Sequence, residues 1–76
     1  MATKHVTVFT YSGKEVDLEI PTNISADDLI HALHQSLEPS RPCPDYIRCD
    51  NPVALLHGSA KVEDFALRDG STLYLI

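Results

Sequence analysis

The stretch HVTVFTYSGKEVDLEI, residues 5–20, contains two runs of alternating side chains with a turn between them. Residues 5–11 are rich in β-branched and aromatic residues, and residues 15–20 alternate acidic with aliphatic side chains. Both patterns are typical of β-strands, the second of a strand with one face in water. Ser12-Gly13-Lys14 has the composition of a short turn, so a β-hairpin is predicted. Its core side should carry Val6, Val8, Val16, Leu18 and Ile20.

A helix is predicted next, after Pro21 ends the second strand. Ser25 is a favourable N-cap, Asp28 follows at the capping-box position, and Asp27 adds negative charge at the positive end of the helix dipole. The helix should run to about Leu37, since Pro39 prevents continuation. Its apolar residues recur at helical spacing and should form one buried face: Ala26, Leu29, Ile30, Leu33 and Leu37.

Three further strands are predicted after a proline-rich connection, at residues 46–50, 53–57 and 72–76. A compact connector at 61–67 should place Val62, Phe65 and Leu67 in the core. The element order is ββαβββ, an α+β fold with a mixed sheet and one helix packed across it. No linker long enough to separate two domains is present, so residues 1–76 are expected to form a single domain.

The charge and composition of the chain limit the kinds of partner and cellular location that we expect. The net charge is −5, from eleven acidic and six scattered basic residues, which argues against nucleic acid or an anionic membrane surface. No apolar run approaches a membrane span and no secretory leader is evident, so we expect a cytoplasmic protein without membrane insertion. Cys43 and Cys49 match neither a metal-binding pair nor a disulfide framework, and both are expected to be reduced.

The order and its residue signals resemble ubiquitin over nearly the whole chain, which implies the β-grasp fold. The hairpin through Ile20 and the closing segment, residues 62–76, carry the similarity. Within that superfamily the chain is most similar to the EsaB/YukD family of bacterial ubiquitin-like proteins. The leucine-rich helix at 29–37, the Ile47-Arg48 start of the third strand and the Asp69-Gly70 turn carry this resemblance.

The family resemblance implies a function in the type VII (WXG100) secretion system. Its members are free-standing, are regarded as non-conjugating, and are associated with a membrane-embedded export machine. We therefore expect a cytosolic accessory or regulatory subunit that is not an enzyme, binds no cofactor, and docks onto a protein of that machine. The sequence ends at Ile76 in its last predicted strand, without the Gly-Gly tail that conjugated modifiers use. Two alternatives stay open: a modifier or sulfur-carrier protein whose tail is missing from this chain, and a ubiquitin-like adaptor unrelated to secretion.

The outer face of the sheet is the predicted interaction site. If Val6, Val8, Leu73 and Leu75 point inward, alternation directs Phe9, Tyr74 and Ile76 outward. The first and last strands are neighbours in a β-grasp sheet, so these residues should cluster, with Arg48 beside them. Aromatic residues and arginine are enriched at binding hot spots. The alternative is ordinary scattered apolar surface.

Comparison with ubiquitin adds a fifth residue to this site. Ubiquitin binds most partners through an aliphatic patch on its sheet, and this chain has Tyr11, Arg48 and Ile76 at the corresponding positions. A cation at the central position implies that ordinary ubiquitin receptors would not recognise it. The predicted interaction residues are therefore Phe9, Tyr11, Arg48, Tyr74 and Ile76.

Other groups of polar residues in the sequence predict no catalytic or metal site. Asp27, His31 and His34 share a helix face, but no fourth ligand is evident, so a solvated face is favoured. Cys43 has no partner base in the sequence pattern.

The acids of residues 15–19 should form the wet face of an edge strand, with docking of a basic partner as a secondary possibility. An open edge at the second or fourth strand could pair with another chain, so a monomer or weak dimer is expected.

Overall fold

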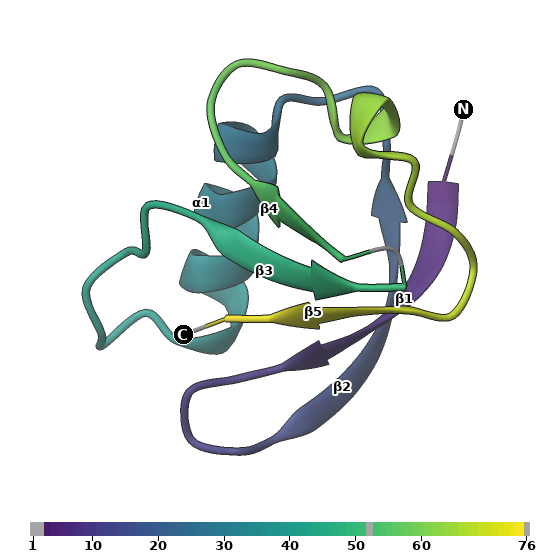
Figure 1. Cartoon of the computed structure of the whole chain (residues 1–76). Coiled ribbons are helices and arrows are strands. Elements are labelled where there is room, and N and C mark those ends of the chain that lie inside the picture. The colour runs from purple at the N-terminus through teal and green to yellow at the C-terminus, as the bar shows by residue number, and fades with distance from the viewer. Residues whose placement is uncertain (1–2, 52, 76) are drawn as a thin grey trace.

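The computed structural model describes residues 3–51 and 53–75, and its elements follow the predicted order (Figure 1). A short 3₁₀ helix, η1, occupies the predicted connector before the last strand. The elements are β1 (Thr3–Phe9), β2 (Glu15–Pro21), α1 (Ala26–Leu37), β3 (Ile47–Asp50), β4 (Ala54–Leu56), η1 (Val62–Phe65) and β5 (Ser71–Tyr74).

The five strands form one mixed sheet in the order β2-β1-β5-β3-β4. The first and last strands are neighbours, as the β-grasp resemblance implied, and they run parallel, whereas the other pairs are antiparallel. Figure 1 shows α1 lying across one face of the sheet, and no helix of the described residues covers the opposite face. The result is the predicted β-grasp architecture, with β2 and β4 as its two edges.

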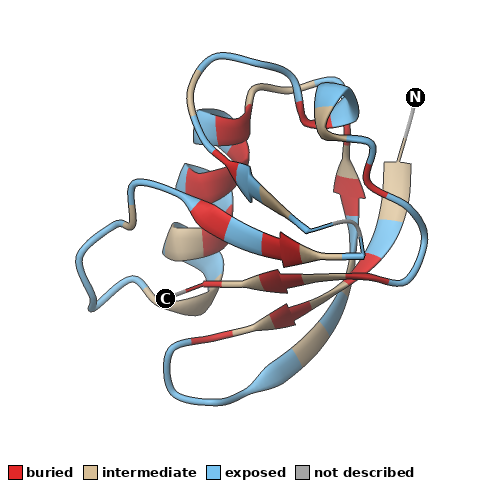
Figure 2. Cartoon of the chain, viewed as in Figure 1, coloured by how far each residue is buried: buried red, intermediate tan, exposed pale blue. Residues whose placement is uncertain are grey.

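The core lies between α1 and the inner face of the sheet (Figure 2). Val8, Leu73 and Cys49 occupy successive strands in one register row and are fully buried. The helix adds Ala26, Leu29, Ile30 and Leu33, with Leu37 half-buried beside them. The predicted apolar helix face is therefore confirmed. Of the predicted hairpin residues, Val6, Val8 and Ile20 are buried, whereas Val16 and Leu18 are half-buried because they lie on an edge strand.

Helix α1 begins where the capping signals predict. The Ser25 hydroxyl oxygen accepts a hydrogen bond from the Asp28 N–H at 3.1 Å. The N–H groups of Ala26 and Asp27 donate to the carbonyls of Ala60 and Gly58, so the free donors of the first turn are satisfied by a loop distant in sequence. The helix has 12 residues, and within the described ranges no helix is long and apolar enough to cross a membrane.

The predicted end of the first strand is wrong by two residues, because β1 stops at Phe9 rather than at Tyr11. Thr10 is buried and begins the turn. Its N–H donates to the Lys14 carbonyl at 2.9 Å, and its hydroxyl oxygen accepts from the Lys14 N–H at 3.1 Å. The Gly13 N–H closes the turn onto the Thr10 carbonyl, with Gly13 at a φ of 90° that favours glycine. A threonine that reads as a strand residue therefore organises the turn.

Candidate functional site

Strand register places one line of side chains across the full width of the outer sheet face. Phe9 on β1 pairs with Glu15 on β2 and with Tyr74 on β5; Arg48 on β3 pairs with Tyr74 and with Leu55 on β4. We call Glu15, Phe9, Tyr74, Arg48 and Leu55 the cross-sheet row. One residue away along each strand lies the buried row that contains Val8, Leu73 and Cys49. Because a one-residue slip would turn that buried row outward, the core fixes the cross-sheet row on the open face.

The centre of the row is a stack of two rings and a guanidinium group. The rings of Phe9 and Tyr74 are nearly parallel, with centroids 5.4 Å apart and an interplanar angle of 13°. The guanidinium carbon of Arg48 lies 4.4 Å from the Tyr74 ring centroid on the other side. Contacts of both kinds are favourable by about 0.5–1 kcal/mol each at exposed positions. The structure thus brings together three of the five predicted site residues and holds them in a fixed arrangement.

Leu55 extends this surface and was missed by the sequence prediction. It is 51% exposed, next to Arg48 in the register, and its neighbour Leu56 is fully buried. The exposed-then-buried leucine pair is a signal of strand alternation that was available in the sequence. It could not be assigned to the site without knowing that β4 pairs with β3.

Acidic residues line the rest of the open face, next to the cross-sheet row. The next outward-facing register row, two residues along each strand from the cross-sheet row, runs from Asp17 through Thr7 and Thr72 to Asp50. The Thr7 hydroxyl donates to Asp17 Oδ1 at 2.8 Å, which fixes the carboxylate beside the sheet. The open face therefore combines an aromatic and aliphatic line with negative charge at both ends of the next row.

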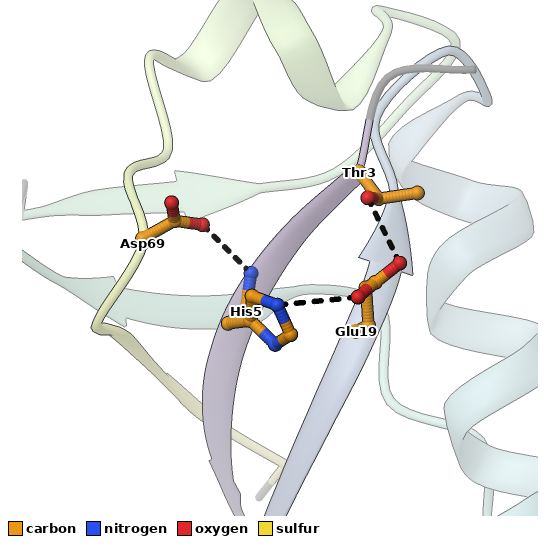
Figure 3. A network of polar contacts seen from close by, with 4 residues as sticks. All are labelled: Thr3, His5, Glu19 and Asp69. Atoms are coloured by element: carbon orange, nitrogen blue, oxygen red, sulfur yellow. Dashed lines mark hydrogen bonds and ion pairs between the residues drawn. The ribbon is translucent and has the colours of Figure 1, made fainter.

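A polar network continues this acidic region to the far end of β1 (Figure 3). Glu19 accepts a hydrogen bond from the Thr3 hydroxyl at 3.0 Å and lies 3.2 Å from the Nε2 atom of His5. The His5 backbone N–H donates to Asp69 Oδ1 at 3.0 Å. This network ties β1 to β2 and to the loop before β5, so the predicted acidic stripe of the edge strand is largely engaged in contacts within the chain.

Tyr11 lies apart from the cross-sheet row, because β1 ends before it. Its ring packs against the Arg41 guanidinium, with the guanidinium carbon 3.3 Å from the ring centroid. Tyr11, Arg41, Pro42 and Leu75 line a hollow of about 180 Å³ between the hairpin turn and the proline-rich connection. The fifth predicted site residue, Ile76, lies outside the described residues.

Glu38, the C-cap of α1, connects the helix to the hairpin turn. Its Oε1 atom accepts a hydrogen bond from the Ser12 N–H at 3.2 Å. That bond, offset in part by desolvation and assisted by the Thr10 side chain, lowers the pKa of the Glu38 carboxyl below its ordinary value of 4.5. The contact anchors the turn from which Tyr11 projects.

The histidines of α1 contact the proline-rich connection rather than a metal-type cluster. His34 Nε2 lies against the Arg41 carbonyl oxygen, and His31 Nδ1 lies 3.8 Å from the Cys43 thiol. The Asp27 carboxylate, on the same helix, accepts a hydrogen bond from the Gly58 N–H at 2.8 Å. In the described ranges, no three metal-ligating side chains come together.

The two cysteines differ sharply in environment. Cys43 is exposed, and its proximity to His31 was missed because the residues are distant in sequence. Cys49 is fully buried, and burial, assisted by the nearby Asp50 charge, raises the pKa of its thiol to about 11. Cys49 is therefore a core residue without the thiolate character that nucleophilic chemistry needs.

A β-grasp sheet with one helix-covered face and one open, stacked aromatic row defines a ubiquitin-like module. The model of one protein family matches residues 4–75 of the chain, and that family is described as protein YukD of the WXG100 protein secretion system (Wss). The chain belongs to the YukD family, as the resemblance of its helix and closing turn implied. No curated protein matches the chain.

Solved structures with similar folds are ubiquitin-like. The ubiquitin-like domain of an Arabidopsis thaliana protein has a TM-score of 0.71 at 16% identity, covering 100% of this chain and 78% of that chain. The ubiquitin-like domain of Plasmodium falciparum Dsk2 has a TM-score of 0.67 at 19% identity, covering 96% of this chain and 97% of that chain. A protein designed on the basis of ubiquitin has a TM-score of 0.71 at 15% identity, covering 97% of this chain and 87% of that chain. Likeness at these identities shows the fold alone.

Proposed function

We propose that this protein is a cytosolic accessory subunit of a bacterial WXG100 (type VII) secretion system that acts by non-covalent docking. Its contact surface is the cross-sheet row, with Phe9, Tyr74 and Arg48 at the centre and Leu55 at one end. Tyr11 and Ile76, the other predicted contact residues, belong to the same proposal as contacts beyond the row. The docking partner is the cytosolic part of a membrane subunit of the secretion machine.

The observation that carries this proposal is the Phe9–Tyr74–Arg48 stack on the sheet face opposite α1. Aromatic residues and arginine are enriched at hot spots, and aromatic rings bury large areas at a small cost in side-chain entropy. In this chain the stack already holds those side chains in place, which lowers the ordering cost of binding further. Membership of the YukD family connects such a surface to the secretion system.

The proposed mode of action is binding without catalysis. The polar groups that come close to one another have structural roles, as in the Asp27–Gly58 and Glu38–Ser12 contacts. The Cys43–His31 contact, at 3.8 Å, lies on an exposed connection next to Pro44, whose carbonyl also accepts from the thiol. Because the thiol donates to the Pro44 carbonyl, we assign the Cys43–His31 contact no catalytic role.

Site-directed photo-crosslinking in host cells tests the proposal. The aromatic photo-crosslinker benzoylphenylalanine replaces Tyr74 in one variant and Gln35, exposed on α1, in the matched control. We expect the variant at position 74 to crosslink to a subunit of the secretion machine, and the variant at position 35 to give none of that product. Crosslinks to the machine from position 35 alone would place the contact on the helix face and overturn the site. No crosslink to the machine from either position would overturn the proposed function.

A further inference from the structure

We infer that the protein forms a weak symmetric dimer by antiparallel pairing of β4 with β4 of a second copy. The sheet has two open edges, β2 and β4. Exposed strand edges pair with other chains unless charge, bulges or cover prevent it. The two edges of this sheet differ in whether they carry features that prevent pairing.

Edge strand β2 is closed to self-pairing by its charges. Its outward-facing positions are Glu15, Asp17 and Glu19, all exposed. In an antiparallel pair of two such strands with their core sides aligned, every register that pairs more than three residues places a carboxylate of one copy opposite a carboxylate of the other. Like charges directly opposite destabilise a strand pair.

Edge strand β4 is only three residues long, but it carries no charge that would oppose a second copy. Val53 is 84% exposed and Leu55 is 51% exposed, and the stretch Val53–His57 contains no carboxylate. Within the described residues, the backbone of this stretch makes hydrogen bonds only in its ladder with β3. Asn51, at a φ of 64°, and Gly58, at a φ of 82°, bend the chain on either side and leave a short straight edge.

A two-fold axis at Leu55 gives the register of the pair. Leu55 then faces its own copy, Val53 faces His57 of the second copy, and Ala54 faces Leu56 on the core side. No carboxylate faces another across this edge. The pairing also joins the two cross-sheet rows end to end through Leu55, which would present two docking surfaces on one continuous open face. The inferred dimer goes beyond the proposed function and does not depend on it.

The short edge and the charge of the chain set the strength of this dimer. A pair of strands this short buries less than the 1,200 Å² or so that stable interfaces reach, so association should be weak. Each copy carries a net charge of −5, so the copies repel one another at low ionic strength. Dimerisation should therefore strengthen as salt is raised, the opposite of the trend for binding to a basic partner.

Sedimentation equilibrium of the purified protein up to millimolar concentration tests the dimer. We expect reversible association that strengthens with salt and weakens about tenfold or more in Leu55→Lys, since two lysines would then face each other across the axis. The matched edge variant Asp17→Asn, which changes the net charge by the same amount, should associate at least as strongly as the wild type. A wild-type protein that stays monomeric at every concentration and salt level would overturn the inference, as would unchanged association of Leu55→Lys.

Disulfide trapping locates the interface independently. Residues directly opposite in an antiparallel pair have Cβ atoms about 4.5–5.5 Å apart, within reach of a disulfide after small adjustment. In a Cys43→Ser background, Leu55→Cys should form a covalent dimer rapidly with oxidised glutathione, whereas Asp17→Cys on the other edge should not. Equal trapping at both edges, or faster trapping at position 17, would overturn the assignment to β4. Neither assay involves a secretion subunit, so failure here leaves the docking proposal untouched.

Discussion

The guanidinium group of Arg48 lies over the ring of Tyr74, 4.4 Å from its centroid, and the opposite face of that ring stacks on Phe9. These residues come from three adjacent strands, β3, β5 and β1, that are distant in the sequence. The stack therefore forms only when β1, β5 and β3 pair in the observed register. It also turns flexible surface side chains into a preformed contact surface.

A double-mutant cycle on Phe9 and Tyr74 measures this stack in the free protein. Phe9→Leu and Tyr74→Leu each keep an apolar side chain but remove the ring contact. We expect a coupling free energy of about 0.5–1.5 kcal/mol in urea unfolding, because the rings gain energy beyond the area they bury. The same cycle between Tyr74 and Phe65, which lies in η1, should be additive. Additivity of the Phe9 and Tyr74 variants would contradict the stacked arrangement.

Replacing Ala66 with glycine should stabilise the protein. Ala66 has a φ of 58°, in the left-handed region, where a Cβ atom costs roughly 1–2 kcal/mol. Glycine loses more chain entropy on folding, so the expected net gain is about 0.5–1 kcal/mol. Chemical denaturation of Ala66→Gly measures it. Ala60→Gly, at a position without positive φ, is the control and should lower stability; a loss in both variants would show that Ala66 is unstrained.

The Glu38 contact predicts a pH dependence of stability. The folded-state pKa of Glu38 is lowered by the Ser12 N–H, so the carboxylate contributes stability above its ordinary value of 4.5. That contribution is lost as the pH falls through the lowered folded-state pKa. Glu38→Gln should therefore be less stable than the wild type at neutral pH, by a small amount because the group is exposed, and the difference should vanish in acid. A difference that is constant down to acid pH would show that ionisation of Glu38 is not its source.

Thiol labelling should separate the two cysteines. Cys43 is exposed and Cys49 is fully buried with a pKa raised to about 11. Iodoacetamide at mildly alkaline pH should add one label to the native protein and two in urea, as counted by mass spectrometry. The variant Cys43→Ser should take no label until it unfolds. Rapid double labelling of the native protein would show that β3 opens readily or is misplaced.

Local signals in the sequence predicted most of the fold. The predicted helix start at Ser25 was correct because the cap involves only the Ser25 hydroxyl and the N–H of Asp28, three positions later. The hairpin was correct because strand alternation is a local pattern. The end of β1 was not, because Thr10 turns inward through bonds with Lys14 and so acts as a turn residue despite its strand propensity.

The candidate site was only partly predictable, because it depends on pairing between distant strands. Phe9 and Tyr74 could be placed side by side once the β-grasp order was assumed. Leu55 and the Cys43–His31 contact could not, since each requires the position of a segment that local patterns leave free. The position of Tyr11 could not be predicted from local patterns either. Its ring lies beyond the end of β1 and packs against Arg41.

The central claim is that the open sheet face binds the secretion machine, and affinity capture of Tyr74→Ala tests it most directly. Tagged wild-type protein, Tyr74→Ala and the helix-face control Gln35→Ala would be captured from detergent-solubilised host membranes, with the recovered secretion subunits quantified by mass spectrometry. We predict that the wild type and Gln35→Ala recover the same subunit and that Tyr74→Ala recovers about tenfold less, as expected for a hot-spot loss of more than 1 kcal/mol. Equal recovery by all three proteins, with each shown to be folded, would contradict the account.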